Sequence, residues 1–140
     1  MGSRKRNTAN RNKEEKAGKY LAVLRDCPIS PRKMRLVADL VRGQEVNHAL
    51  DILKYSPQNA SKDLEKLLLS AVSNWQNKNE GVRIEESNLF VSEIKVDKGR
   101  TLKRFRPAPQ GRAHRIRKRS NHVTVILVSS NKNEEKQTEN

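Results

Sequence analysis

The sequence has little of what enzymes and secreted proteins depend on. Its 140 residues include one cysteine, Cys27, so no disulfide can form within the chain, and a reduced cytosolic setting fits best. The three histidines, His48, His114 and His122, have no partner at the spacing of a zinc site. No glycine-rich phosphate loop or nucleophile motif is present. We therefore expect neither an enzyme nor a bound metal or cofactor.

Long apolar runs are also missing. No stretch approaches the roughly 18 apolar residues of a membrane span. The basic N-terminus has no apolar segment behind it, which argues against a secretory signal. Neither basic segment has the pattern of an amphipathic helix that lies on a membrane surface. We expect no membrane insertion.

Acidic residues are scarce where basic residues are dense. The formal net charge is +14. Residues 98–119 contribute +10 with no acid, residues 1–19 contribute +5, residues 120–140 contribute −1, and residues 20–97 are neutral. This distribution predicts a neutral body with two basic appendages. A polyanion is the natural partner, with nucleic acid first and an anionic membrane surface second.

The apolar pattern predicts an α+β fold in which three helices pack on a small three-stranded antiparallel sheet. Helical spacing of three and four predicts helices over residues 31–42, 47–54 and 60–75. Alternation and β-branched residues predict strands near residues 20–25, 89–97 and 122–128. The last of these strands is the most apolar and is expected at the centre of the sheet.

The first predicted helix has a core side and a basic side. Ser30 can cap free backbone N–H groups, and Pro31 suits the first helical position. The core side is expected to hold Met34, Leu36, Val37, Leu40 and Val41. The opposite side is expected to hold Arg32, Arg35, Asp39 and Arg42, which serve either as nucleic-acid contacts or as a plain solvent face.

A segment of about two dozen residues separates the last two predicted strands, which is too long for an ordinary loop in a small domain. We expect both strands to continue past the body as an extended β-hairpin over residues 97–121. Pro107, Pro109 and Gly111 mark its turn. Residues 19–129 then form a single globular α+β domain that includes this hairpin. Residues 1–18 are expected to be a disordered basic arm, and residues 130–140 a disordered tail.

Both faces of the predicted hairpin are basic. Alternation places Lys98, Arg100, Arg104 and Arg106 on one face of the outgoing strand and Lys103 on the other. Since neither face can pack on a protein core, and an isolated ribbon is marginal in water, the hairpin is expected to be surrounded by phosphates. Arginine favours forked phosphate contacts, and Phe105 can stack on an unpaired base.

Two rival functions remain open on these residues alone. One is a DNA-bending protein with a β-ribbon arm, which would need a large apolar dimer face. The body has apolar residues for its own core only, so we expect no homo-oligomer. The other is an enzyme acting on RNA, which would depend on His48, His114 or His122.

Several motifs, in register over residues 19–129, resemble the large-subunit ribosomal protein twenty-two family (the universal uL22 family) in its bacterial form. The run from Ser30 to Gly43 resembles the family's first helix, and Leu67-Leu68-Leu69-Ser70-Ala71 resembles its long helix. Residues 101–107, 111–116 and 118–125 resemble its extended hairpin.

The resemblance implies a structural constituent of the large subunit that binds rRNA and assists assembly in the cytoplasm. It also implies that the hairpin lines the nascent-peptide exit tunnel and that the globular part lies near the exit. The partners implied are large-subunit rRNA, neighbouring ribosomal proteins and the nascent polypeptide.

The resemblance assigns roles to particular residues. The rRNA-binding residues implied are Arg32, Lys33, Arg35, Arg42, Lys98, Arg100, Lys103, Arg104, Arg106, Arg112, His114, Arg115, Arg117, Lys118 and Arg119. The hairpin tip implied at the tunnel wall consists of Lys103, Arg104, Phe105, Arg106, Pro107, Ala108, Pro109, Gln110 and Gly111.

Overall fold

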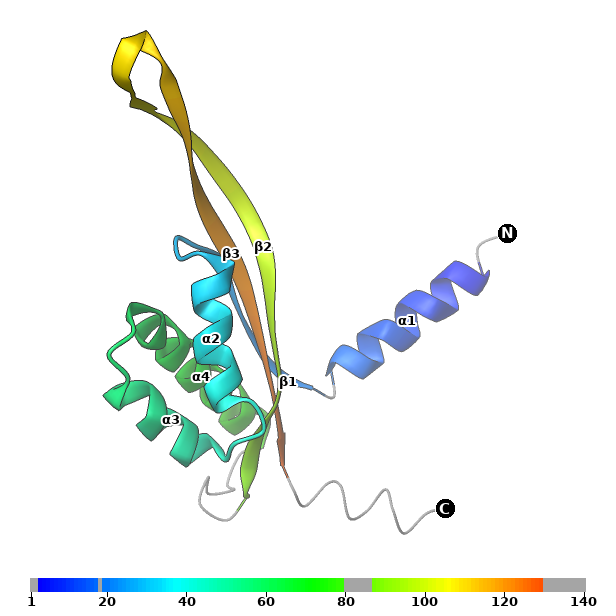
Figure 1. Cartoon of the computed structure of the whole chain (residues 1–140). Coiled ribbons are helices and arrows are strands. Elements are labelled where there is room, and N and C mark those ends of the chain that lie inside the picture. Colours follow the sequence, from blue (N-terminus) through cyan, green and yellow to red (C-terminus); the bar gives the residue numbers. More distant parts are fainter. Residues whose placement is uncertain (1–2, 18, 80–86, 130–140) are drawn as a thin grey trace.

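The computed structural model describes residues 3–17, 19–79 and 87–129 (Figure 1). The helices are α1 (Ser3–Ala17), α2 (Pro31–Val41), α3 (Val46–Tyr55) and α4 (Asn59–Lys78). The strands are β1 (Tyr20–Cys27), β2 (Leu89–Pro107) and β3 (Ala113–Ser129), and a short 3₁₀ turn, η2 (Pro109–Gly111), joins the last two. The expected tail over residues 130–140 lies outside the described residues.

The three strands form one antiparallel sheet in the order β1-β3-β2. The apolar residues 123–128 thus lie in the central strand, as their β-branched composition predicts. Alternate residues of β3, from Asn121 to Ser129, are buried, while those between them are half-buried. The predicted α+β fold with its small antiparallel sheet is confirmed.

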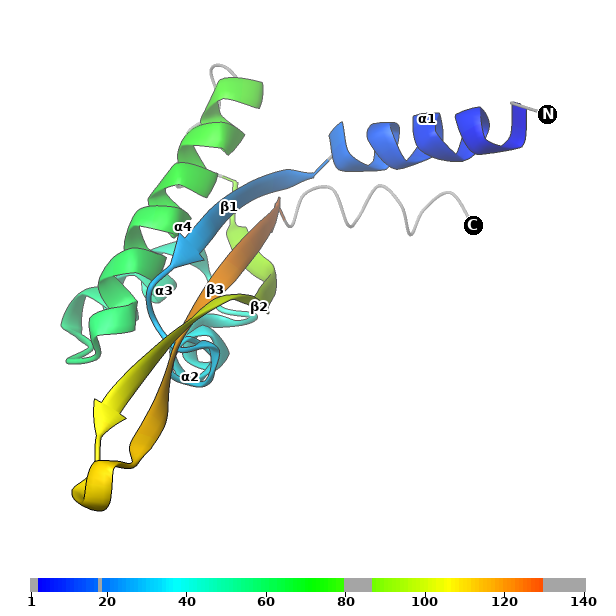
Figure 2. The same ribbon diagram turned by 90° about the horizontal axis from the view of Figure 1, so that it is seen from above.

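Helices α2, α3 and α4 lie together beside the sheet, while α1 and the hairpin project away from it (Figures 1 and 2). The buried core joins Met34 and Val37 of α2 to Leu64 and Leu68 of α4 and to the inner residues of the strands. The loop after α2 runs along the outer edge of β2. There the Gly43 N–H donates to the Val91 carbonyl at 2.9 Å, and the Val91 N–H donates to the Gln44 carbonyl at 2.9 Å.

Helix α2 buries a different stripe from the one expected. Its buried residues are Pro31, Met34, Val37, Ala38 and Val41. Leu36 and Leu40 were expected in the core, but they are 62% and 50% exposed. The small Ala38 lets the helix pack closely along the 34–37–38–41 stripe, which has the helical spacing of three and four, and this orientation turns the two leucines outward.

Helix α1 corrects the expectation of a disordered N-terminal arm over residues 3–17, so the described residues form four α-helices instead of the three expected. Its residues include no proline or glycine and are rich in lysine, glutamate and arginine, which have good helix propensity. The described side chains, from Ser3 to Lys13, are all exposed. The sequence did not predict this helix, because prediction relied on apolar residues that recur every three or four positions, and α1 has no apolar face.

Cys27 ends β1 inside the core and is 3% exposed. Burial raises the pKa of its thiol, and the thiol donates a hydrogen bond to the Asp63 carboxylate, with a Sγ–Oδ2 distance of 3.5 Å. A thiol held in its protonated form is a poor nucleophile. Cys27 is therefore a packing residue and not a reactive one.

This burial predicts a loss of stability in alkali. Above pH 9.0, the ordinary pKa of the thiol, the unfolded chain ionises Cys27 while the folded chain keeps the proton. The folded state then binds more protons, so the free energy of unfolding falls as pH rises. Urea unfolding of the wild type and of Cys27→Ala, at neutral pH and above pH 9.0, should show the wild type losing more stability. An equal loss in both proteins would contradict this account.

Candidate RNA-binding surface

The hairpin extends beyond the body as a two-stranded ribbon whose side chains are exposed on both faces. Strands β2 and β3 stay paired out to Pro107 and Ala113. Every side chain from Leu102 to Arg119 is exposed except Ala108, which is half-buried. This pairing confirms the long protruding hairpin of the predicted fold.

A β-bulge at the base of the hairpin changes which residues share a face. Lys98 pairs with Asn121 and Thr101 pairs with Arg119, so β2 has one extra residue at this point. A Cβ on Gly99 would lie 2.7 Å from the Ser120 Oγ and 3.1 Å from the Ser120 carbonyl carbon. Only glycine therefore allows the strands to approach here, and the Ser120 hydroxyl donates to the Arg100 carbonyl at 2.7 Å.

Beyond the bulge, the register defines two faces. The first face has Lys103, Phe105, Arg115, Arg117 and Arg119, and the second has Leu102, Arg104, Arg106, His114, Ile116 and Lys118. Lys98 pairs with Asn121 and so lies on the side of Arg119, which corrects the expectation that it shares a face with Arg104 and Arg106. Arg100 lies beside Leu102 and Lys118 of the second face, around a concavity that the three residues line. The conclusion that both faces are basic is confirmed by the pairing.

The turn of the hairpin lies at the proline and glycine residues that were expected to form it. Gln110 and Gly111 have positive φ values of 61° and 70°, and the Ala108 N–H donates to the Arg112 carbonyl at 2.9 Å. Glycine tolerates this backbone conformation at little cost, and Pro109 begins the turn where no ladder N–H is needed. Phe105, 70% exposed, lies just before the tip.

A basic concavity of about 250 Å³ lies where the N-terminus of α2 meets the base of the hairpin. Ser30 and Pro31 line it. So do four cationic side chains from three elements, namely Arg32, Arg35, Lys98 and Arg119. No acidic residue lines it. Cations gathered around a concave surface raise the local concentration of anions, and arginine matches the geometry of a phosphate.

A second concavity, of about 370 Å³, lies at the base of the hairpin. It is lined by Asp26, Pro28, Arg100, Leu102, Lys118, Arg119 and Ser120. Arg119 lines both concavities, so the basic surface continues around this part of the hairpin.

Two predicted RNA contacts also have a structural role. The Arg35 guanidinium donates to the Val96 carbonyl at 2.9 Å, and the Arg42 guanidinium donates to the Ile94 carbonyl at 3.3 Å. These bonds join α2 to the edge strand β2 and leave further donors on each guanidinium. Arg42 also pairs with Asp39 at 2.6 Å. It lies at the far end of α2 and does not line either basic concavity.

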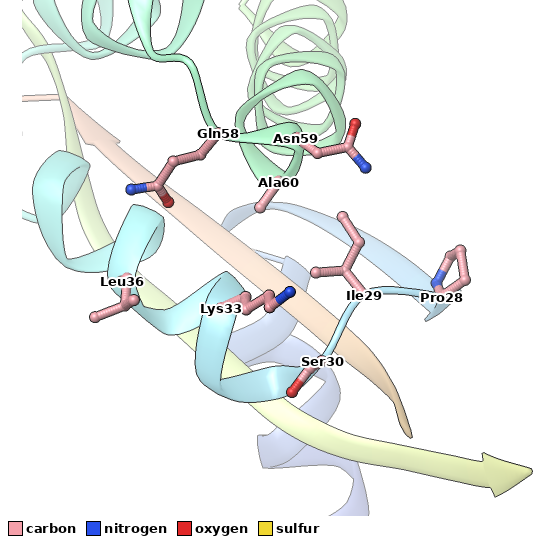
Figure 3. Close-up of a pocket in the computed structure, with 8 residues that line it drawn as sticks. All are labelled: Pro28, Ile29, Ser30, Lys33, Leu36, Gln58, Asn59 and Ala60. Carbon is pink, nitrogen blue, oxygen red and sulfur yellow. The ribbon is translucent and has the colours of Figure 1, made fainter. Parts of the chain in front are cut away.

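Lys33 lies apart from the other predicted cations. It lines a more apolar pocket of about 530 Å³ formed by the β1–α2 loop, α2 and the start of α4 (Figure 3). Leu36 and Ile29 line the same pocket, so Lys33 lies among apolar neighbours.

Neither a metal site nor a membrane span is found in the described parts of the chain. No group of three or more His, Cys, Asp or Glu residues there is placed to hold a metal ion. No helix in the same ranges is long and apolar enough to cross a membrane.

Known ribosomal proteins are similar in sequence to this chain. The family model described as ribosomal protein L22p/L17e matches residues 22–128. The chain belongs to this family. Relatives named large ribosomal subunit protein uL22 include that of Flavobacterium johnsoniae, 63% identical over 94% of this chain and 96% of the relative. Those of Porphyromonas gingivalis and Bacteroides thetaiotaomicron are 60% and 55% identical, over 94% and 96% of this chain and 97% and 98% of the relatives.

Membership of the uL22 family decides among the rival functions that the residues alone left open. A uL22-family protein is a structural component of the large ribosomal subunit and not an enzyme, and its location is the cytoplasmic ribosome. The DNA-bending and RNA-processing alternatives are therefore set aside. The rRNA contacts of individual residues remain predictions.

The supporting residues of this surface were not singled out from the sequence. Asn121 is fully buried, and its side-chain amide donates to the Ile29 carbonyl at 2.7 Å, which fixes the start of α2 beside the hairpin base. The sequence nevertheless contains a signal for each of two supporting residues, Asn121 and Gly99. Asn121 interrupts an inward-facing apolar alternation, and Gly99 lies within a strand, where glycine often marks a bulge.

Replacing Asn121 with alanine should destabilise the body. The substitution leaves the Ile29 carbonyl without its donor, and a lost buried hydrogen bond of this kind costs about 1–3 kcal/mol. Urea unfolding at neutral pH measures the loss. The matched control is Asn77→Ala, since Asn77 is exposed on α4, and it should stay within about 0.5 kcal/mol of the wild type. Equal stability of the two variants would remove Asn121 from its supporting role.

Proposed function

We propose that this uL22-family chain binds large-subunit rRNA with both faces of its hairpin and with the basic concavities at the hairpin base. Through these contacts it assists the assembly of the subunit. Its hairpin lines the nascent-peptide exit tunnel, and its globular part lies near the exit. The chain acts as a single copy among neighbouring ribosomal proteins.

The two-faced hairpin is the observation that carries this proposal. Cations lie on both faces of the paired strands, and only Ala108 between Leu102 and Arg119 is not exposed. A ribbon that lay on an RNA surface would need cations on one face only. Cations on both faces suit a ribbon inserted between RNA segments, where phosphates on each side neutralise it.

The basic concavities extend this surface to the body. Arg32 and Arg35 of α2 line one concavity with Lys98 and Arg119 of the hairpin. A single RNA backbone segment seated there would touch both parts of the protein and so fix their orientation on the RNA. Arg42 contributes less to this contact, since it is paired with Asp39 away from the hairpin base.

The place of the tip in the fold supports the proposal that it lies at the tunnel wall. Residues 103–111 are the part of the described chain farthest along the hairpin from the body (Figure 1). The tip and the residue that follows it offer the exposed side chains of Arg106 and Arg112 and the exposed ring of Phe105. Such a surface binds rRNA by phosphate contacts and base stacking, and its outer side is left to the nascent polypeptide.

Truncation of the hairpin tests the proposal. Replacing residues 103–117 with Asn-Gly should leave a two-residue turn closing the Leu102–Lys118 pair, and it keeps the bulge and Asn121. The body should remain folded by circular dichroism. The variant loses six cations. The slope of log affinity for large-subunit rRNA against log salt should therefore become shallower by about 4 to 5, at ~0.7–0.9 per phosphate.

A charge control separates hairpin contacts from net charge. Lys54, Lys62 and Lys66 are exposed on α3 and α4, and changing all three to glutamine should leave the salt slope at its wild-type value. A truncated chain that kept the wild-type slope would refute rRNA binding by the hairpin.

A further inference from the structure

The more apolar pocket beside α2 has no role in the proposal so far. Pro28, Ile29, Leu36 and Ala60 supply its apolar surface, and Ser30, Lys33, Gln58 and Asn59 its polar groups. Figure 3 shows the Lys33 side chain extending from α2 toward Ile29, while the Gln58 side chain extends from the residue just before α4 to the side on which Leu36 lies. Its volume, about 530 Å³, is in the usual range of ligand-binding pockets, ~300–1,000 Å³.

Two side chains at this pocket, those of Leu36 and Gln58, contribute neither core packing nor helix capping. Leu36 is 62% exposed and belongs to the pair of α2 leucines that the core leaves out. Gln58 is the N-cap residue of α4, yet its side chain makes no capping hydrogen bond. Within the described residues its amide has no other partner, so a donor and an acceptor are both available at the pocket.

The pocket adjoins the basic concavity at the hairpin base. Ser30 lines both, and Pro31 and Arg32 follow it directly into the concavity. The Ser30 side chain was expected to cap α2, but it makes no cap hydrogen bond. In Figure 3 its hydroxyl points away from Gln58 and Ala60. An apolar pocket with two amides, those of Gln58 and Asn59, and one lysine thus lies against a concavity with four cations.

We infer that the pocket and the concavity together bind one unstacked nucleotide of the rRNA, which rests on the proposed function. The base enters the apolar pocket against Ile29 and Leu36, and its polar edge is met by the Gln58 amide. The phosphate beside that base lies in the concavity among Arg32, Arg35, Lys98 and Arg119. Recognition of RNA commonly uses unstacked bases held between apolar surfaces and hydrogen-bonded at their edges.

Charge favours RNA over a protein in this site. An apolar side chain of a neighbouring protein would cover Leu36 and Ile29, but it would leave the four cations of the adjoining concavity without anions. A nucleotide suits both the apolar pocket and the basic concavity, because it joins an apolar base to a charged phosphate over a short distance. The shared residue Ser30 makes the pocket and the concavity adjacent.

Two neutral substitutions test the site without changing any charge. In Leu36→Ser the apolar wall is lost, and in Gln58→Ala the amide is lost. Each should weaken binding of the full chain to large-subunit rRNA by about fivefold at every salt concentration, with an unchanged salt slope. Chemical probing of the rRNA, resolved to single nucleotides, should show one base that the wild type protects and both variants leave reactive.

Matched controls use the same substitutions elsewhere. Leu69 is 48% exposed and Gln76 is exposed, both on α4, so Leu69→Ser and Gln76→Ala should bind and protect as the wild type does. Circular dichroism verifies that all four variants fold.

Three results would overturn the nucleotide site. Leu36→Ser and Gln58→Ala could bind and protect the RNA as their controls do, while hairpin truncation still flattens the salt slope; the proposed function would then stand without this site. The two variants could instead keep full RNA affinity and protection but lose a neighbouring ribosomal protein from assembled subunits, which would make the pocket a protein-docking site. Absence of rRNA binding by the wild type would remove the proposed function and this site with it.

Discussion

Repulsion among the cations of the hairpin is the constraint on which the rest of the structure depends. Residues 98–119 have ten lysines and arginines and no acid. From Leu102 to Arg119 every side chain of the ribbon except that of Ala108 is exposed. A two-stranded ribbon is marginal in water even without such charge. The rigid body therefore has to fix the base of the hairpin, and the partner has to neutralise the remainder.

The base is fixed by uncharged contacts. Gly99 allows the close approach of the strands at the bulge, Ser120 bonds across it, and Asn121 ties the central strand to the loop before α2. Arg35 and Arg42 then hold α2 along the edge of β2. Together these contacts orient the basic concavity relative to the hairpin, so one RNA backbone segment can meet both.

Much of this architecture could be predicted from the sequence, and the failures have physical causes. Alternation and the proline–glycine cluster located the hairpin and its turn, because those signals are local. The burial of α2 was predicted wrongly at Leu36 and Leu40, since the packing partner decides which flank of a wide apolar face is buried. The all-polar helix α1 gave no periodic signal. The regrouping of faces depended on a single extra residue near Gly99, and strand alternation alone does not show such an insertion.

The central claim is that rRNA contacts both faces of the hairpin, and two matched variants test it most directly. One changes Lys103, Arg115 and Arg117 to glutamine on the first face, and the other changes Arg104, Arg106 and Lys118 on the second. Each removes one lysine and two arginines. The account predicts that each variant makes the salt slope of rRNA binding shallower by about 2 to 3. A wild-type slope in either variant would show that only one face of the hairpin meets RNA, and would contradict the account.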